Sequence, residues 1–402
     1  MISVEEARAY IKAHIAPIGI HDVPLSVAAG HTLGADIYAK IDIPAFKQSS
    51  MDGYAIRYGD RQRILTVSGE MQAGADKGFT LSPFEAARIF TGAPLPAGAD
   101  TVVMQEKVSL NNGMLTILDP NLKIGLNVRN KGDEVKSGAL AMAKGSKLSP
   151  AAIGFLAGIG TADVPVYRRP SVAIIVTGKE LQRPGKALEF GQVYESNSYS
   201  LTAALEQAQI TKINFYTADD ILEELVNVLR EAINANDVVL LTGGVSVGDY
   251  DFVIPAAEQL GIRQIFHKVK QRPGKPLYFG KKNGKVIFGM PGNPSSVLSC
   301  FYQYVLPALE IMMNSNNISN NTGNPKEGVK VVDAVLTHNF SKAAGLTHFL
   351  KAHFNDGKVT PLHAQESFRM SSFAEANCMI ELEEEQLVFP AGTLVKVHLL
   401  PD

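Results

Sequence analysis

Carboxylates, glycines and basic side chains gather in short loops in the middle of the sequence. In residues 237–251, the aliphatic run Val238–Leu241 leads to Gly243 and Gly244, and the stretch ends at Asp251. An aliphatic run that stops at a glycine pair is typical of a buried strand followed by a loop. Backbone N–H groups in such a loop can hold an anion, whereas a carboxylate there repels one unless a cation lies between them. The stretch therefore predicts a phosphate ligand together with a metal ion.

Three further polar loops in the same region are expected at strand ends, namely Thr177–Glu180, Asp219–Asp220 and Arg272–Pro276. In a doubly wound sheet, loops that follow parallel strands share one edge. The side chains that would approach one cleft are Glu180, Asp219, Asp249, Asp251, Arg272 and Lys275. Arginine and lysine can hold an oxyanion, and clustered carboxylates favour a hard cation such as magnesium. Zinc is not expected, because no cysteine or histidine pair accompanies these residues.

Each loop also has a simpler interpretation. A glycine pair after a strand is commonly only a turn, and Asp219–Asp220 could cap the helix that follows. Lys275 and Arg272 could be solvated surface charges, and Met290–Pro294 could be a rigid turn into a helix. Asp52, which precedes a glycine, could cap a turn. Taken singly, the loops leave these alternatives open.

Length and composition set the class of protein. The 402 residues suggest three or four domains, and 46% hydrophobic with 19% charged residues is typical of a globular protein. The net charge of −2 gives no reason to expect nucleic acid as a partner. Cys300 and Cys378 fit no metal or disulfide spacing, which favours a reducing cytosol and buried thiols. Polar residues and proline interrupt Val297–Met313, so we expect a core helix there and no membrane partner.

Strand and helix patterns divide the chain into segments. Ser3 and Glu6 form a capping box, which predicts an amphipathic N-terminal helix and no export signal. Short alternating runs from Ile64 to Val135 predict a small β domain. From Pro170 to Met313, strands alternate with helices, which predicts a largely parallel sheet. The asparagine-rich segment Asn314–Asn324 is expected to be a linker before a small C-terminal β domain.

Individual elements can be expected from the same patterns. Strands are expected at Val172–Val176, Lys212–Tyr216 and Val238–Leu241. Helices are expected at Ser149–Gly160, Ser198–Gln207, Ile221–Ala235 and Phe252–Leu260, the first of them capped by Ser149.

Six motifs in a fixed order carry a resemblance to a known family. They are SSMDGYA at Ser49–Ala55, FTGAPLPAGAD at Phe90–Asp100, TGKEL at Thr177–Leu181, GGVSVGDYDF at Gly243–Phe252, RPGKP at Arg272–Pro276 and MPGNPSS at Met290–Ser296. In these motifs the sequence resembles the MoeA/gephyrin family, the molybdopterin molybdenumtransferases of molybdenum cofactor biosynthesis. Each motif is weak alone, whereas six in register over nearly the whole chain are specific.

The resemblance implies a multidomain α/β plus β fold. Its expected parts are an elongated discontinuous domain I at residues 1–45 and 138–169, a β-rich inserted domain II at 46–137, a MogA/MoaB-like α/β domain III with a mostly parallel sheet at 170–313, and a linker with a C-terminal β-barrel-like domain IV at 314–402. A homodimer with an active site between the subunits is also implied. We further expect a cytoplasmic location and contact with the molybdopterin adenylyltransferase.

The resemblance also implies the reaction and its residues. Molybdenum from molybdate is placed on adenylylated molybdopterin, and AMP leaves in a magnesium-dependent step that needs positioning and charge neutralisation. The residues expected to be catalytic are Asp52, Glu180, Asp219, Asp251 and Lys275, with Asp219 and Asp251 as Mg²⁺ ligands. The residues expected to bind substrate are Thr91, Arg129, Glu134, Gly243, Gly244, Ser246, Arg272, Pro291, Pro294, Lys351 and Ser367.

Within this set, separate tasks are expected. Gly243, Gly244 and Ser246 would seat the pterin-side phosphate, while Lys275 and Arg272 would hold molybdate or offset charge on the pyrophosphate. The residues that would face the glycine loop of the other subunit are Asp52, Thr91, Arg129 and Glu134.

Two other functions remain open. A MogA-like molybdopterin adenylyltransferase would share the Gly-Gly loop, but such enzymes resemble the α/β segment alone. A non-catalytic molybdopterin-binding scaffold is the second alternative, and the acidic and basic cleft residues make it less attractive.

Overall fold

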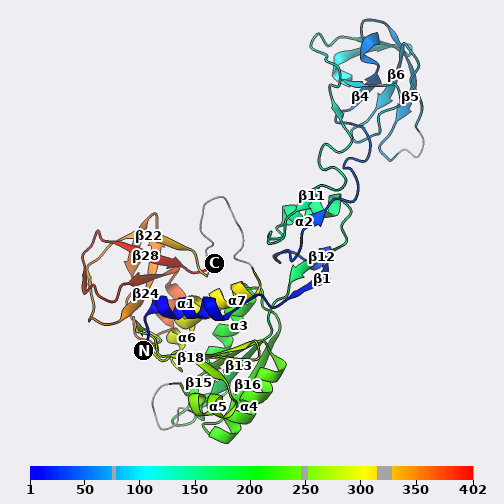
Figure 1. The fold of residues 1–402 in the computed structure, drawn as a ribbon. Coiled ribbons are helices and arrows are strands. Elements are labelled where there is room, and N and C mark those ends of the chain that lie inside the picture. Colours follow the sequence, from blue (N-terminus) through cyan, green and yellow to red (C-terminus); the bar gives the residue numbers. More distant parts are fainter. Residues whose placement is uncertain (75–77, 246–251, 315–327, 402) are drawn as a thin grey trace.

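The structure of the protein is a computed structural model that describes residues 1–74, 78–245, 252–314 and 328–401. The chain folds into four units (Figure 1). An α/β domain and a C-terminal barrel lie side by side at one end, a narrow arm leads away from them, and a small β domain lies at the far end of the arm. No helix among the described residues is long and apolar enough to cross a membrane.

A six-stranded sheet forms the centre of the α/β domain. Its strands, in spatial order, are β16 (Ile213–Ala218), β13 (Val172–Thr177), β17 (Val238–Thr242), β21 (Lys285–Met290), β20 (Tyr278–Lys282) and β18 (Arg263–His267). The first four are parallel to one another, β20 runs antiparallel to β21, and β18 runs antiparallel to β20 and so in the direction of the first four. The expected largely parallel sheet and the three expected strands are thus confirmed.

Helices cover both faces of this sheet because its central strands are apolar on both sides. Along β13, Val172, Ile174 and Val176 enter one core while Ala173 and Ile175 enter the other. The first face is covered by α3 (Asn197–Gln207), α6 (Pro294–Cys300) and α7 (Leu306–Met312), and the second by α4 (Leu222–Ala235) and α5 (Val253–Gln259). A run buried on both faces is what parallel sheets require.

One helix differs in detail from the sequence expectation, and the N-terminal helix agrees with it. The core helix expected at Val297–Met313 begins at Pro294 and contains a π-helical stretch, Phe301–Val305, just before Pro307. A proline cannot donate to the preceding turn, and a wider turn accommodates the missing bond. Helix α1 (Val4–His14), with the predicted capping box at Ser3, packs its apolar side into the first core of the α/β domain.

The arm consists of two chain segments that run in opposite directions. Strand β1 (Ile20–Pro24) pairs with β12 (Asp163–Tyr167), and β2 (Ile37–Tyr38) pairs with β11 (Leu140–Met142). Helix α2 (Pro150–Gly158) completes a small core in the arm, and its N-cap Ser149 accepts a 3.2 Å hydrogen bond from the N–H of Ala152. The predicted cap is therefore present.

The small β domain is inserted between the two segments of the arm. Its sheet contains β7 (Thr101–Met104), β4 (Gly53–Ile56), β6 (Glu85–Ile89), β5 (Leu65–Met71), β9 (Met114–Ile117) and β8 (Val108–Asn111), in that order. The chain enters and leaves at one place, where β3 (Gln48–Ser49) pairs with β10 (Val128–Arg129) and Ile43 bridges to Val135.

The C-terminal unit is a closed barrel. Its five strands are β24 (Thr347–Asn355), β25 (Lys358–Pro361), β22 (Val331–Leu336), β28 (Leu394–Leu399) and β26 (Cys378–Leu382), and β26 pairs back to β24. The short strand β19 (Gln271–Arg272) of the α/β segment adds to β24 from outside. The pair β23 (Phe340–Ser341) and β27 (Val388–Phe389) and helix α8 (Ser371–Glu375) complete the unit. Both cysteines are buried, as expected.

Candidate active site

The four parallel strands end at one edge of the sheet, and a cavity of about 740 Å³ opens there, which we call the sheet-edge cavity. Its walls include Gly178 and Glu180 after β13, Asp220 after β16, Gly243–Gly244 after β17, and Pro291–Pro294 after β21. The shared edge that the strand pattern predicted is therefore present. Ser246, Asp249 and Asp251 lie outside the described residues.

The Arg272–Pro276 loop reaches this edge by another route. It follows β19 and leads into β20, which is antiparallel, so the beginning of β20 lies beside the end of β21. Pro276 lines the cavity. The side chains of Arg272 and Lys275 are exposed and are not among its lining residues.

Close backbone packing explains the glycine pair. Gly243 and Gly244 have φ angles of +92° and +63°, which disfavour residues with a side chain. A Cβ atom on Gly243 would lie 2.7 Å from Oγ1 of Thr177. The N–H of Gly243 donates to the carbonyl of Met290 at 3.0 Å, which ties two of the strand ends together. The pair is thus required by the geometry of the site and is more than an exposed turn.

The adjacent aspartates of the β16 loop have different surroundings. Asp220 lines the sheet-edge cavity with Glu180, and its pKa is raised first by burial and then by the charge of Glu180. Asp219 lines a neighbouring cavity of about 760 Å³ that shares Gly178 with the first. Neither aspartate caps α4, because its N-cap is Ile221, without a side-chain cap bond. The sequence pointed to this pair with Asp219 as the predicted site residue, and the lining of the two cavities shows that Asp220 is the one at the sheet-edge cavity.

The described carboxylates fit a magnesium ion that a substrate would help to bind. No group of three or more described His, Cys, Asp or Glu residues could hold a metal alone. Glu180 and Asp220 both line the cavity, however, and the negative charge of Glu180 raises the pKa of Asp220. Magnesium is usually held by one or two carboxylates together with phosphate oxygens. Glu180 and Asp220 meet that requirement.

Buried polar atoms without partners gather around the sheet-edge cavity. Among the described residues they include Oδ1 of Asn197, Oγ1 of Thr242 and Oγ of Ser295. Asn197 and Thr242 line the cavity, and Ser295 follows Pro294 in its wall. Burying such atoms without hydrogen bonds is costly, so their position favours a polar ligand. These three residues were missed in the sequence, because their environment depends on loops far apart along the chain.

The barrel contributes one rim of the cavity. Phe368 lines it, while Oγ of Ser367 accepts a 2.9 Å hydrogen bond from Asn293 and the carbonyl of Ser367 accepts one from the N–H of Ser295. Lys351 supports this loop from inside, since its ammonium group donates to the carbonyls of Ala364, Glu366 and Arg369 at 2.8, 3.3 and 2.9 Å. Ser367 thus lies at the cavity, whereas the described contacts of Lys351 are with the protein.

The remaining predicted residues lie in or beside the inserted β domain, at the other end of the arm (Figure 1). Oδ1 of Asp52 accepts hydrogen bonds of 2.8 Å from both the N–H and the hydroxyl of Thr91, and these bonds lower the pKa of Asp52. Arg129 is exposed on β10, and Glu134 is exposed where the domain joins the arm. Within one chain, these residues do not meet the sheet-edge cavity.

Comparison with known proteins agrees with this architecture. Three family models match in chain order: "MoeA N-terminal region (domain I and II)" over residues 2–160, "Probable molybdopterin binding domain" over 173–311, and "MoeA C-terminal region (domain IV)" over 333–400. A protein of Haemophilus influenzae named molybdopterin molybdenumtransferase is 33% identical over 417 residues, covering 100% of both chains. One of the same name from Staphylococcus aureus is 34% identical over 388 residues, covering 94% of this chain and 90% of its own.

Solved structures give the same result. Two structures of a molybdopterin biosynthesis MoeA protein from Pyrococcus horikoshii superpose with TM-scores of 0.84 and 0.80 at 31% and 29% identity. The first covers 99% of both chains and the second 100%. With full-length relatives above 30% identity and family models in order along the sequence, the chain belongs to the MoeA family.

Proposed function

We propose that the protein transfers molybdenum from molybdate to adenylylated molybdopterin and releases AMP. The observation that carries this proposal is the sheet-edge cavity, which combines a glycine pair, the carboxylates of Glu180, Glu195 and Asp220, and buried polar atoms that lack partners among the described residues. The names of its full-length relatives support the same reaction.

The substrate would be held mainly by the strand-end loops. The N–H of Gly243 already donates to Met290, so the pterin-side phosphate would bind at Gly244 and the loop beyond it, where Ser246 is a predicted contact. The hydroxyl of Thr242 would donate a hydrogen bond to the substrate, and Oδ1 of Asn197 would accept one from it. Pro291 and Pro294 would form a stiff wall, because proline fixes the backbone and adds no competing donor.

Magnesium would be held by Glu180 and Asp220 together with oxygens of the pyrophosphate. When bound, it would offset negative charge on the pyrophosphate during cleavage. Asp219, which lines the neighbouring cavity, and Asp251 remain predicted ligands. Lys275 and Arg272 are proposed to hold molybdate from the rim, where exposed cations can reach an incoming anion.

The working unit is proposed to be a homodimer in which Asp52, Thr91, Arg129 and Glu134 complete the cavity of the other subunit. Their distance from the cavity in their own chain supports this arrangement (Figure 1). A mixture of Asp52→Asn and Asp220→Asn subunits tests it. If each site uses one residue from each subunit, a mixed dimer has one intact site of its two. About half of the dimers in an equal mixture are mixed, so about a quarter of wild-type activity should return. Two variants that stay inactive when mixed would contradict the shared site.

The reaction is tested by measuring AMP release from adenylylated molybdopterin with and without molybdate and magnesium. Release that depends on molybdate and is lost in Asp251→Asn and Asp220→Asn is the expected result. Formation of the adenylate from ATP and molybdopterin, without AMP release, would identify an adenylyltransferase instead. Tight binding with neither reaction would identify a scaffold. The full-length match to relatives named molybdenumtransferases favours neither alternative.

A further inference from the structure

A second cavity, of about 470 Å³, lies where the arm, the α/β domain and the barrel meet, and we call it the junction cavity. The arm contributes His31, Lys147 and Arg169, the α/β domain contributes Tyr302 and Met313, and further lining residues come from the barrel segment, such as Lys330 and Leu400. It shares no lining residue with the sheet-edge cavity. The junction cavity is therefore a separate place at which a ligand would touch three parts of the molecule.

Two neighbouring arginines at the base of the arm differ in whether a carboxylate pairs with them. Arg168 forms two hydrogen bonds of 2.8 and 2.9 Å with the carboxylate of Asp237, which raises its pKa. Arg169 instead donates to two neutral oxygens, Oε1 of Gln209 at 2.7 Å and the carbonyl of Ala29 at 3.5 Å. Burial lowers the pKa of Arg169, and no described carboxylate forms an ion pair with it. An anion bound beside a half-buried guanidinium that has only neutral acceptors would stabilise its charge.

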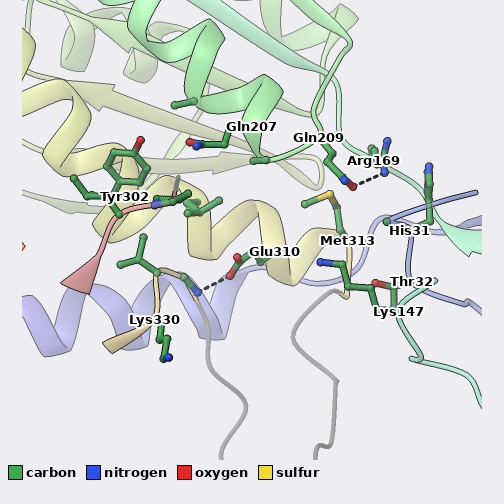
Figure 2. Close-up of a pocket in the computed structure, with 18 of the residues that line it drawn as sticks. His31, Thr32, Lys147, Arg169, Gln207, Gln209, Tyr302, Glu310, Met313 and Lys330 are labelled. Atoms are coloured by element: carbon green, nitrogen blue, oxygen red, sulfur yellow. Dashed lines mark hydrogen bonds between the residues drawn. The ribbon is translucent and has the colours of Figure 1, made fainter. Parts of the chain in front are cut away.

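His31 lies beside this arginine and is also incompletely satisfied. Its Nδ1 atom is buried and has no hydrogen-bond partner among the described residues. Burial, and then the charge of Arg169, lowers the pKa of His31 to about 4. Lys147 adds a second cation on the same side of the cavity, as Figure 2 shows. The arm side of the cavity is thus cationic, with a buried polar atom that lacks a partner.

The opposite side is lined by apolar residues and, from the barrel segment, by Lys330. Tyr302, Leu306 and Met313 line it from the helices of the α/β domain, and Leu400 lines it from the end of the barrel. In Figure 2, Tyr302 lies across the cavity from His31, Lys147 and Arg169, with Met313 between them. Glu310, the acidic group among the described lining residues, accepts a hydrogen bond from the N–H of Gly328 at the barrel side. An apolar wall with cations at one end suits a ligand with an apolar body and one anionic group.

We propose that the junction cavity binds an aromatic anion, with its phosphate or carboxylate group at Arg169, Lys147 and His31 and its ring against Tyr302, Leu306 and Met313. This binding is separate from the proposed molybdenum transfer. A ligand in this position contacts the arm and both units at its base, so it would hold the arm at one angle.

Binding to the full-length protein is measured by calorimetry with phenyl phosphate and with benzoate, and with inorganic phosphate and phenol as probes of each half. Arg169→Gln is expected to weaken phenyl phosphate by at least about tenfold, and Lys147→Gln by a few-fold. Lys144→Gln is the matched control, because Lys144 is exposed three residues before Lys147 but does not line the cavity. Tighter binding of phenyl phosphate than of benzoate would identify a phosphate ligand, and the reverse order a carboxylate.

Hydrogen exchange with phenyl phosphate bound locates the site independently of the variants. Protection is expected in residues 28–33 and 302–313, which surround the junction cavity. No binding by either aromatic anion, or equal affinity in Arg169→Gln, Lys147→Gln and wild type, would overturn the proposal. Protection confined to residues near Gly243 would also overturn it, since the probe would then occupy the sheet-edge cavity. Lys147 is exposed, so its variant keeps the test valid even if Arg169→Gln does not fold.

Discussion

The two cavities of this molecule are built in different ways. Main-chain loops at the ends of successive parallel strands form most of the sheet-edge cavity, so its shape follows from the sheet. Side chains from three separate units form the junction cavity, and its character comes from charge that the protein does not neutralise. The first kind of site is fixed by one domain, whereas the second depends on how the domains meet. Perturbing each therefore has different consequences.

The largest effect is expected from Gly243→Val. The new side chain would meet Thr177 at 2.7 Å from its first carbon, at a φ angle of +92°, and would displace two strand ends. Activity should fall at least about a hundredfold because substrate positioning is lost. Gly113→Val is the control, since Gly113 has φ +76° but open space around its Cβ position. It should lose about 1–3 kcal/mol of stability and keep its activity. Equal activity losses in the two variants would show that general strain is responsible.

A smaller but specific effect is expected from Asp220→Asn. AMP release should fall about a hundredfold in this variant and less than about tenfold in Asp219→Asn, because only Asp220 lines the sheet-edge cavity. Without ligand, Asp220→Asn should be more stable than wild type at pH 7. Its pKa is raised in the fold, so its ionised form opposes folding above the unfolded pKa and the difference disappears in acid. Thermal melting of Asp220→Asn and wild type at pH 3 and 7 checks the direction of this stability difference. A larger activity loss in Asp219→Asn than in Asp220→Asn would show that Asp219 is the residue the reaction needs.

The barrel rim should respond to Lys351→Met. Three carbonyls would lose the buried ammonium donor, which should cost about 1–3 kcal/mol in urea unfolding and raise the KM by loosening the loop of Ser367. Lys351→Arg should restore part of the KM, since it keeps a donor. Lys358→Met, at an exposed site of β25, provides the control. An altered kcat with unchanged KM and stability would instead indicate direct contact between Lys351 and the reacting groups.

The smallest effect concerns the base of the arm, where Asp237 pairs with Arg168. Burial acts to raise the pKa of Asp237, but bonds from Arg168 and Ser171 outweigh it and lower the pKa to about 2. The lowered pKa contributes stability above the unfolded value of 3.8, and this contribution disappears as the pH falls toward 2. Asp237→Asn should therefore lose about 1 kcal/mol at pH 7, after allowance for solvent screening, and match wild type at pH 2. A loss that persists at pH 2 would assign the effect to packing.

The contrast between the cavities also explains what the sequence could predict. The Gly243–Gly244 pair follows a continuous aliphatic run, so both its strand and its place at the sheet edge were recognisable. The role of Asp220 was not, because the alternation along β16 does not tell which of two adjacent aspartates turns inward. The family resemblance implied that Lys351 contacts the substrate, yet its buried contacts depend on the folded path of residues 364–369.

The junction cavity had no sequence signal at all. Its cations at positions 147 and 169 and the histidine at position 31 belong to separate segments, and only the arm brings them together. Arg168 is paired with a carboxylate and Arg169 with a neutral oxygen. The sequence gives no sign of this difference, because it depends on which of the two arginines faces Asp237.

The inserted β domain leaves the chain almost where it enters, with β3 beside β10 and Ile43 bridged to Val135. Its two ends are therefore close enough to be joined by a short turn, and its two core clusters consist of its own residues. The domain can therefore be deleted, or replaced by the corresponding domain of a relative, without a change in the fold of the rest of the chain. Evolution can then alter what the far end of the arm presents to the second subunit of the proposed homodimer while leaving the sheet-edge loops untouched.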